Sequence, residues 1–193
     1  MRRRTFDALA SVAGLILAAV LVVAGGLALW GHNFTDSQVS SQLAAQKIVF
    51  PAKSNPEFKA LPPADAAAMG QYAGQQMTTG AQAKVYADNF IAFHLSKMGG
   101  TYAALSAQSL AQPDNAKLAA LVNTVFKGTT LRGMLLNAYA FWQIGAIALW
   151  AAIASFIGAG LLLILSVLGF GHARWAGPDK EILAPHTHEK VTT

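Results

Sequence analysis

Two long runs of the chain contain no charged residue, and a polar segment separates them. The runs are Ala8 to Trp30 and Gly133 to Ala173, and neither contains Lys, Arg, Asp or Glu. About 20 apolar residues are enough to cross a bilayer as a helix. The pattern predicts an all-α membrane protein, in which two long transmembrane helices form a hairpin with a small helical extracytoplasmic cap.

The second run is too long for one perpendicular crossing. As a helix its 41 residues would measure about 60 Å, twice the hydrocarbon thickness of roughly 30 Å. Two short spans turning near Ala151-Ala152 are one alternative, but no turn residues lie there and a reversal in lipid leaves backbone groups unpaired. We favour one helix, with an outer extension at 133–143 and the second transmembrane helix at 144–170. Asn137, Tyr139 and Trp142 are then expected to face the cap.

The first run fits a retained anchor better than a cleaved signal peptide. Residues 8–30 form an uncharged core of 23 residues, whereas a signal peptide has an apolar region of about 7–15. Gly26-Leu27-Ala28 offers a cleavage site, so removal remains the less favoured alternative. We interpret 8–30 as the first transmembrane helix.

The basic N-terminus predicts the orientation. Arg2 to Arg4 lie in residues 1–7, directly before the first helix, where positive charge favours the cytoplasmic side. Residues 31–132 would then be extracytoplasmic, and the polar tail at 171–193 would be cytoplasmic and flexible. The sequence thus predicts a multi-pass plasma-membrane protein with both termini in the cytoplasm. Candidate interfacial anchors are Trp30, Trp142, Trp150 and Trp175.

The segment between the runs has a helical pattern. Thr35 to Lys47 is expected to continue the first span as a rod until Phe50-Pro51, and 51–63, with four prolines, to be an extended connector. The strongest helix begins at Thr78 or Thr79 and ends at Gly99-Gly100, with Tyr86, Phe90 and Phe93 on a face that favours core packing. Further helices are predicted at about Tyr102 to Ala111 and from Pro113 to Gly128, and no strand is predicted.

Composition supports the membrane class. Apolar residues make up 54% of the chain and charged residues 12%, against roughly 25% charged in soluble domains. The absence of cysteine excludes disulfides, thiolate metal sites and cysteine nucleophiles. The net charge of +5 is divided between residues 1–30 and 31–132, without the dense basic stripe of a nucleic-acid site. The expected partners are the lipid bilayer and a membrane protein or further copies of this chain, and not nucleic acid.

No catalytic, cofactor-binding or metal-binding residue is assigned, because each candidate has a simpler interpretation. His186 and His188, beside Glu189, could hold a metal loosely, but a solvated tail is favoured. Asp88 and His94 lie roughly 240° apart around a helix and do not form one site unaided. Lys84 pairs with Asp88 at i, i+4.

Two further features concern the membrane. Arg132 precedes the second run and is expected to extend toward lipid headgroups, with a lipid-phosphate contact as an alternative. Small residues at helix-contact spacing predict close approach of helices within or between copies. They are Gly14, Ala18, Ala148, Ala152, Ala154, Gly158 and Gly160.

Four stretches carry a resemblance to a known family. They are MRRRTFDALASVAGLILA, LAAQKIVFP, YAGQQMTTGAQAKVYAD and LRGMLLNAYAFW. They resemble an uncharacterised family of small two-span membrane proteins from high-GC Gram-positive bacteria, over residues 1 to 172. The resemblance implies topology and envelope location but no functional residue. Some members carry the label aromatic ring-opening dioxygenase, which we discount because the scattered His residues do not assemble an iron-binding triad of two His and a carboxylate.

The favoured function is a structural or accessory role in the cell envelope or a membrane complex. A small oligomeric channel or sensor is one alternative. A membrane-anchored enzyme, metal-dependent through the His tail, is another, so enzymatic activity is uncertain but not favoured. The junction of the second span with the cap is where recognition is expected first.

Overall fold

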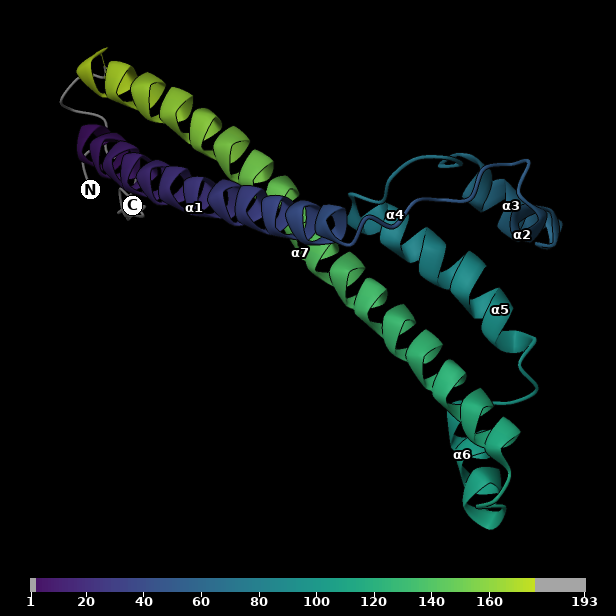
Figure 1. Cartoon of the computed structure of the whole chain (residues 1–193). Helices are drawn as coiled ribbons and strands as arrows, with labels where there is room; N and C mark the ends of the chain where they lie inside the picture. Colours follow the sequence, from purple (N-terminus) through teal and green to yellow (C-terminus); the bar gives the residue numbers. More distant parts are fainter. Residues whose placement is uncertain (1–2, 176–193) are drawn as a thin grey trace, which may run out of the picture. The chain divides into compact units, whose positions relative to one another are not determined.

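The computed structural model describes residues 3–175, and every named element in that range is a helix (Figure 1). The all-α prediction is confirmed for these residues. The chain divides into a terminal unit, from Met1–Trp30 and Ala148–Thr193, and a central unit, Gly31–Ile147. The helices are α1 (Arg3–Ala45), α2 (Pro56–Lys59), α3 (Pro63–Gly70), α4 (Gly80–Val85), the π-helix η1 (Tyr86–Ile91), α5 (Ala92–Ser96), α6 (Tyr102–Ala111) and α7 (Ala116–Trp175).

Two of these helices, α1 and α7, have the length and apolar composition to cross a membrane. Their 43 and 60 residues correspond to about 65 and 90 Å. The predicted continuation of the first span beyond Thr35 is confirmed, because α1 runs without a break to Ala45. The three-span alternative is wrong: α7 passes through Ala151-Ala152 without a turn, so its backbone groups remain paired within the helix.

Within the terminal unit the two helices run antiparallel and approach closely through small residues. A Cβ atom added to Gly14 would collide with the side chain of Ser166, and one added to Gly169 would collide with the side chain of Ser11. The purple start of α1 therefore lies beside the yellow end of α7 (Figure 1). Buried residues recur every seven positions, which is the repeat of left-handed helix pairs. They are Ser11, Ala18 and Gly25 in α1, and Ala152, Ala159, Ser166 and Ala173 in α7.

This seam contains some of the small residues selected from the sequence. Gly14, Ala18 and Ala152 belong to it, and Gly158 has the side chain of Leu21 next to it. Gly160 has no neighbour within 4 Å of its Cβ position and Ala154 is exposed. An alanine-rich helix carries small residues on every face, so spacing alone selects too many.

The central unit has its own hydrophobic core. Phe50, Met69 and Met77 are its largest fully buried side chains. The Phe50 ring lies 5.3 Å from the ring of Tyr72 and 5.3 Å from that of Tyr86, the second in an edge-on arrangement. Other buried members are Val39, Leu43, Phe58, Leu61, Ala83, Ala87, Ile91 and Leu135. One end of α1, one face of α7 and the short helices from α2 to α5 thus share this core.

The proline-rich segment is more ordered than predicted. Residues 51–63 are not simply an extended connector, because α2 forms at Pro56 and α3 begins at Pro63. The Asn55 side chain accepts a hydrogen bond from the Glu57 backbone N–H at 2.8 Å. Proline at the first helical position has no N–H to leave unpaired, so these prolines start helices.

The predicted helix after Thr79 is confirmed, with one change of geometry. Thr79 and Gln82 form a capping box at its start, and Gly99, with φ of 79°, follows its end. The aromatic face packs on the core as expected. Its middle turn, η1, is a π-helix, which hydrophobic spacing does not distinguish from an α-helix.

The helix predicted to end at Gly128 instead continues as α7. Glycine costs about 1 kcal/mol within a helix but does not end it. A Cβ on Gly128 would lie 2.8 Å from Cδ2 of Leu95, so the missing side chain admits a close contact. The predicted α6 is confirmed and lies beside the first turns of α7, where the rings of Tyr102 and Phe126 are 5.5 Å apart (Figure 1).

Candidate functional site

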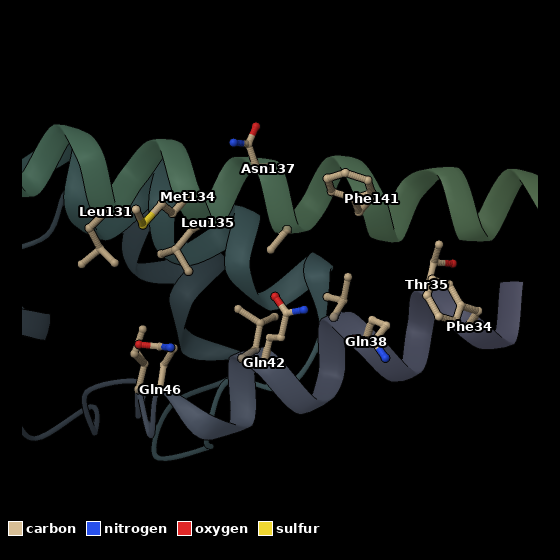
Figure 2. A pocket seen from close by; sticks show the side chains of 14 residues that line it. Phe34, Thr35, Gln38, Gln42, Gln46, Leu131, Met134, Leu135, Asn137 and Phe141 are labelled. Carbon is tan, nitrogen blue, oxygen red and sulfur yellow. The ribbon is translucent and has the colours of Figure 1, made fainter. Parts of the chain in front are cut away.

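An open groove of about 630 Å³ lies between α1 and α7 in the central unit. Its volume falls within the roughly 300–1,000 Å³ of ligand pockets. Figure 2 shows α1 and α7 as its two walls. The lining residues are Phe34, Thr35, Gln38, Val39, Gln42, Leu43, Gln46, Ile48, Leu131, Met134, Leu135, Asn137, Ala138 and Phe141. None of these side chains is charged.

Three glutamines give the α1 wall its polarity. Gln38 and Gln42 are four residues apart and share one side of α1, and Gln46 follows at the same spacing, directly after the last residue of the helix. All three are exposed, and no hydrogen bond engages their carboxamides among the described residues. In Figure 2 Gln42 points toward α7. A carboxamide both donates and accepts hydrogen bonds, so this wall can pair with neutral polar groups.

The α7 wall is mainly apolar and only partly covered. Leu135 is buried in the core, whereas Leu131, Met134 and Phe141 are 40, 63 and 59% exposed. Figure 2 shows Leu131 and Leu135 pointing toward α1, and Asn137 pointing away from it. Burying these exposed side chains against an occupant would be favourable by roughly 25 cal/mol per Å² of apolar surface.

The three junction residues selected from the sequence have different surroundings. Asn137 is among the residues that line the groove, although its side chain points away from α1 (Figure 2). Tyr139 and Trp142 lie elsewhere on α7, with ring centroids 6.2 Å apart, and the Lys84 ammonium lies 5.3 Å from the Tyr139 ring. Trp142 packs against the core and against Gly80, whose missing Cβ leaves room for it. Trp142 is thus part of the packing of the central unit.

A charged cluster joins the π-helical segment to α7. The predicted pair of Lys84 and Asp88 is confirmed, with 2.6 Å between Nζ and Oδ2. Arg132 also binds Asp88, with 2.8 Å between Nη2 and Oδ1, and its Nε donates to the carbonyl oxygen of Ala87 at 3.2 Å. Arg132 does not extend toward headgroups as predicted, because a carboxylate within reach offers a charge-assisted hydrogen bond.

The charges of this cluster shift its titration. Partial burial acts to raise the pKa of Asp88, but the hydrogen bonds and charges of Lys84 and Arg132 outweigh it and hold the pKa below its ordinary value. The hydrogen bond and charge of Asp88 raise the pKa of Lys84. Burial, with a smaller contribution from Glu57, raises the pKa of Tyr86. The cluster therefore stays charged at neutral pH and acts as a structural tie.

Three histidines lie in the described residues, and each has an oxygen atom of another residue within 4 Å of its ring. Nδ1 of His32 is 3.0 Å from the carbonyl oxygen of Gly145, and Nδ1 of His94 is 2.7 Å from that of Phe90. Nε2 of His172 lies 3.9 Å from Oδ2 of Asp7 at one end of the terminal unit. His186 and His188 lie outside the described residues. Within residues 3–175 no three His, Asp or Glu side chains are grouped as metal ligands.

A second, more open hollow of about 720 Å³ lies between α5, α6 and α7. Leu95, Tyr102, Val125 and Arg132 are among its lining residues. The guanidinium of Arg132 already binds Asp88 and Ala87. We therefore take the first groove as the candidate functional site.

Sequence reasoning identified only part of that groove. It selected Asn137 and the junction on α7, but it did not select the three glutamines of α1. Their spacing of four residues within a predicted rod was a usable signal. The facing wall could not be identified, because pairing of α1 with residues 131–141 is a long-range contact without a local pattern.

Comparison of the chain with protein-family models, with curated proteins and with solved structures finds no match.

Proposed function

We propose that this chain is a two-span plasma-membrane protein with both termini in the cytoplasm, whose central unit forms an extracytoplasmic helical cap on a transmembrane hairpin. One observation carries the proposal: the apolar side chains of the terminal unit remain exposed around the helix pair. Leu27 and Ile157, for example, are 65 and 60% exposed. A core helix of a soluble protein would bury such side chains, whereas a bilayer solvates them.

The packing of α1 favours its retention as an anchor over cleavage as a signal peptide. Ser11, Gly14 and Gly25 face residues of α7 at distances that only small side chains allow. Removing residues 1–28 would leave the matching face of α7 without its partner. The positive charges of Arg2 to Arg4 support the cytoplasmic placement of the N-terminus.

Within this topology we propose a structural or accessory role in the envelope, in which the groove of the central unit holds a partner. The uncharged, partly apolar lining supports binding as that role. We also propose that the chain belongs to the family of two-span membrane proteins that its sequence motifs resemble.

Because the chain has no cysteine, single cysteines can test the topology. Ala111→Cys, at the exposed end of α6, should react with a membrane-impermeant maleimide on intact cells. Thr193→Cys should react only after the membrane is permeabilised. If only Thr193→Cys were labelled on intact cells, the orientation would be opposite to the one proposed. If both variants were labelled on intact cells, the two-span topology would be contradicted.

A further inference from the structure

We propose that the groove between α1 and α7 binds a neutral polypeptide segment in extended conformation, with the glutamines of α1 pairing with its backbone amides. The inference adds a ligand class to the proposed accessory role. It rests on the lining of the groove and on the spacing of its polar side chains, and both lie within the central unit.

The spacing of the glutamines matches an extended chain. Residues four apart on a helix are separated by about 6 Å along its axis. In an extended chain, residues that face the same way are about 6.6 Å apart. Successive glutamines, Gln38, Gln42 and Gln46, can therefore pair with successive alternate residues of one peptide, one glutamine to each. The accumulated mismatch over the three glutamines is only about 1.2 Å, within the reach of a flexible side chain.

The chemistry of the wall matches a peptide backbone. A backbone amide presents one N–H donor and one C=O acceptor, and a carboxamide presents both partners for them. The groove extends from Phe34 on α1 to Gln46 just after its end, about 18 Å, which corresponds to five or six extended residues. Alternate side chains of the peptide would then point toward the exposed apolar residues of the groove, such as Leu131 and Phe141.

The absence of charge in the lining favours this occupant over a phospholipid. An anionic headgroup is held by Lys or Arg, and neither lines the groove. Arg132, on the same turn of α7 as Leu131, binds Asp88 instead. An acyl chain would use the apolar wall but leave three carboxamides without a role. A charged peptide would bury its charge among uncharged groups at a cost.

The test uses the full chain in phosphatidylcholine nanodiscs and a pool of end-blocked hexapeptides in which Ser alternates with Ala, Val, Leu or Phe. Equilibrium dialysis with mass spectrometry selects the most strongly retained peptide, and fluorescence anisotropy of its labelled form gives Kd. We expect Gln38→Leu, Gln42→Leu and Gln46→Leu each to raise Kd roughly five-fold, the loss of about one hydrogen bond. Gln108→Leu, an equally exposed glutamine on α6, should leave Kd unchanged.

Backbone recognition has a separate readout. N-methylation of alternate amides in the selected peptide removes donors without changing its side chains, and should weaken binding at least ten-fold. Circular dichroism of each variant checks that the helices are retained. The proposal is overturned if no peptide is retained above empty nanodiscs, if the glutamine variants or N-methylation leave Kd unchanged, or if a fluorescent sixteen-carbon fatty acid binds saturably and displaces the peptide. Peptide binding in nanodiscs does not depend on the orientation of the chain in the cell membrane. The peptide proposal can therefore fail while the proposed topology stands, and the topology can fail while the peptide proposal stands.

Discussion

Arg132 of α7 donates a hydrogen bond to Asp88 of the π-helical segment across 44 positions of sequence, with 2.8 Å between Nη2 and Oδ1. The other carboxylate oxygen binds Lys84, and Nε of Arg132 binds the carbonyl oxygen of Ala87. One carboxylate thus links two cations from different helices. Because Asp88 and Arg132 are 30 and 39% exposed, solvent screens this link, and its contribution is about 1 kcal/mol.

Replacing Arg132 should therefore destabilise the central unit modestly. We expect Arg132→Gln to lower the free energy of unfolding by about 1 kcal/mol, since it removes the charge and both contacts. Lys127→Gln, at an exposed position of the same helix, is the matched control and should have little effect. Denaturant unfolding in detergent, followed by tryptophan fluorescence, measures both. Equal effects of the two substitutions would show that the Asp88 contact contributes nothing.

The same cluster gives a pH dependence of defined sign. The pKa of Asp88 in the folded state lies below its ordinary value of 3.8, so its stabilisation is fully present above that value and is lost as the pH falls through the folded pKa. The difference in unfolding free energy between the native chain and Asp88→Asn should shrink as the pH falls from about 5 to about 2. A difference that stays constant over this range would contradict the assignment.

Tyr86 should titrate later than a solvated tyrosine. Burial raises its pKa above the ordinary 10.0, so the neutral phenol contributes stability below that pH, and this contribution is lost as the pH rises through the folded pKa. In an alkaline titration of tyrosinate absorbance, the difference between the native chain and Tyr86→Phe should have a midpoint above 10. A midpoint at the ordinary value would indicate that the ring is solvated.

The close approach of the helices in the terminal unit depends on Gly14. A large side chain there meets Ser166, so Gly14→Ile should cost about 1–3 kcal/mol through overpacking. Gly26 lies on the same helix with no neighbour within 4 Å of its Cβ position, and Gly26→Ile is the control. Thermal unfolding in detergent should show a lower midpoint for the Gly14 variant alone. The same loss in both variants would indicate that the seam is not formed.

Gly80 makes a second contact that leaves no space for a side chain. A Cβ there meets Cβ and Cγ of Trp142, and these atoms lie too near the backbone of α7 to move aside. We expect Gly80→Ala to destabilise the central unit by at least about 1 kcal/mol. Gly133→Ala, where nothing lies within 4 Å, should be neutral or slightly stabilising because alanine favours helix. A Gly80→Ala variant as stable as the native chain would contradict this contact.

Local patterns predicted the helices of this chain well. The capping box at Thr79, the aromatic face around Phe90 and the stop at Gly99 depend on neighbouring residues, and each appears in the structure. The long-range features could not be predicted in this way. The ion pair of Arg132 and the packing of Leu95 against Gly128 depend on how distant segments meet.

The errors have the same origin. Gly128 was expected to end a helix and Arg132 to reach lipid, because both interpretations considered only the residues beside them. In the candidate site, Asn137 was identifiable from its place near an apolar run, whereas Gln38, Gln42 and Gln46 acquire meaning only when a second helix lies opposite them.

The seven-residue repeat of the terminal unit also limits how these helices can change in length. Ser11, Ala18 and Gly25 follow one another at equal steps along α1. Inserting a single residue after Ser11 would rotate everything beyond it by about 100°, which would turn Ala18 and Gly25 away from α7 and bring Leu17 and Ala24 to their places in the seam. Inserting seven residues would bring Ala18 and Gly25 back to the side of α1 that packs against α7. Viable insertions or deletions in this part of the chain should therefore come in whole repeats, although substitutions on the side of α1 away from the seam are free to accumulate.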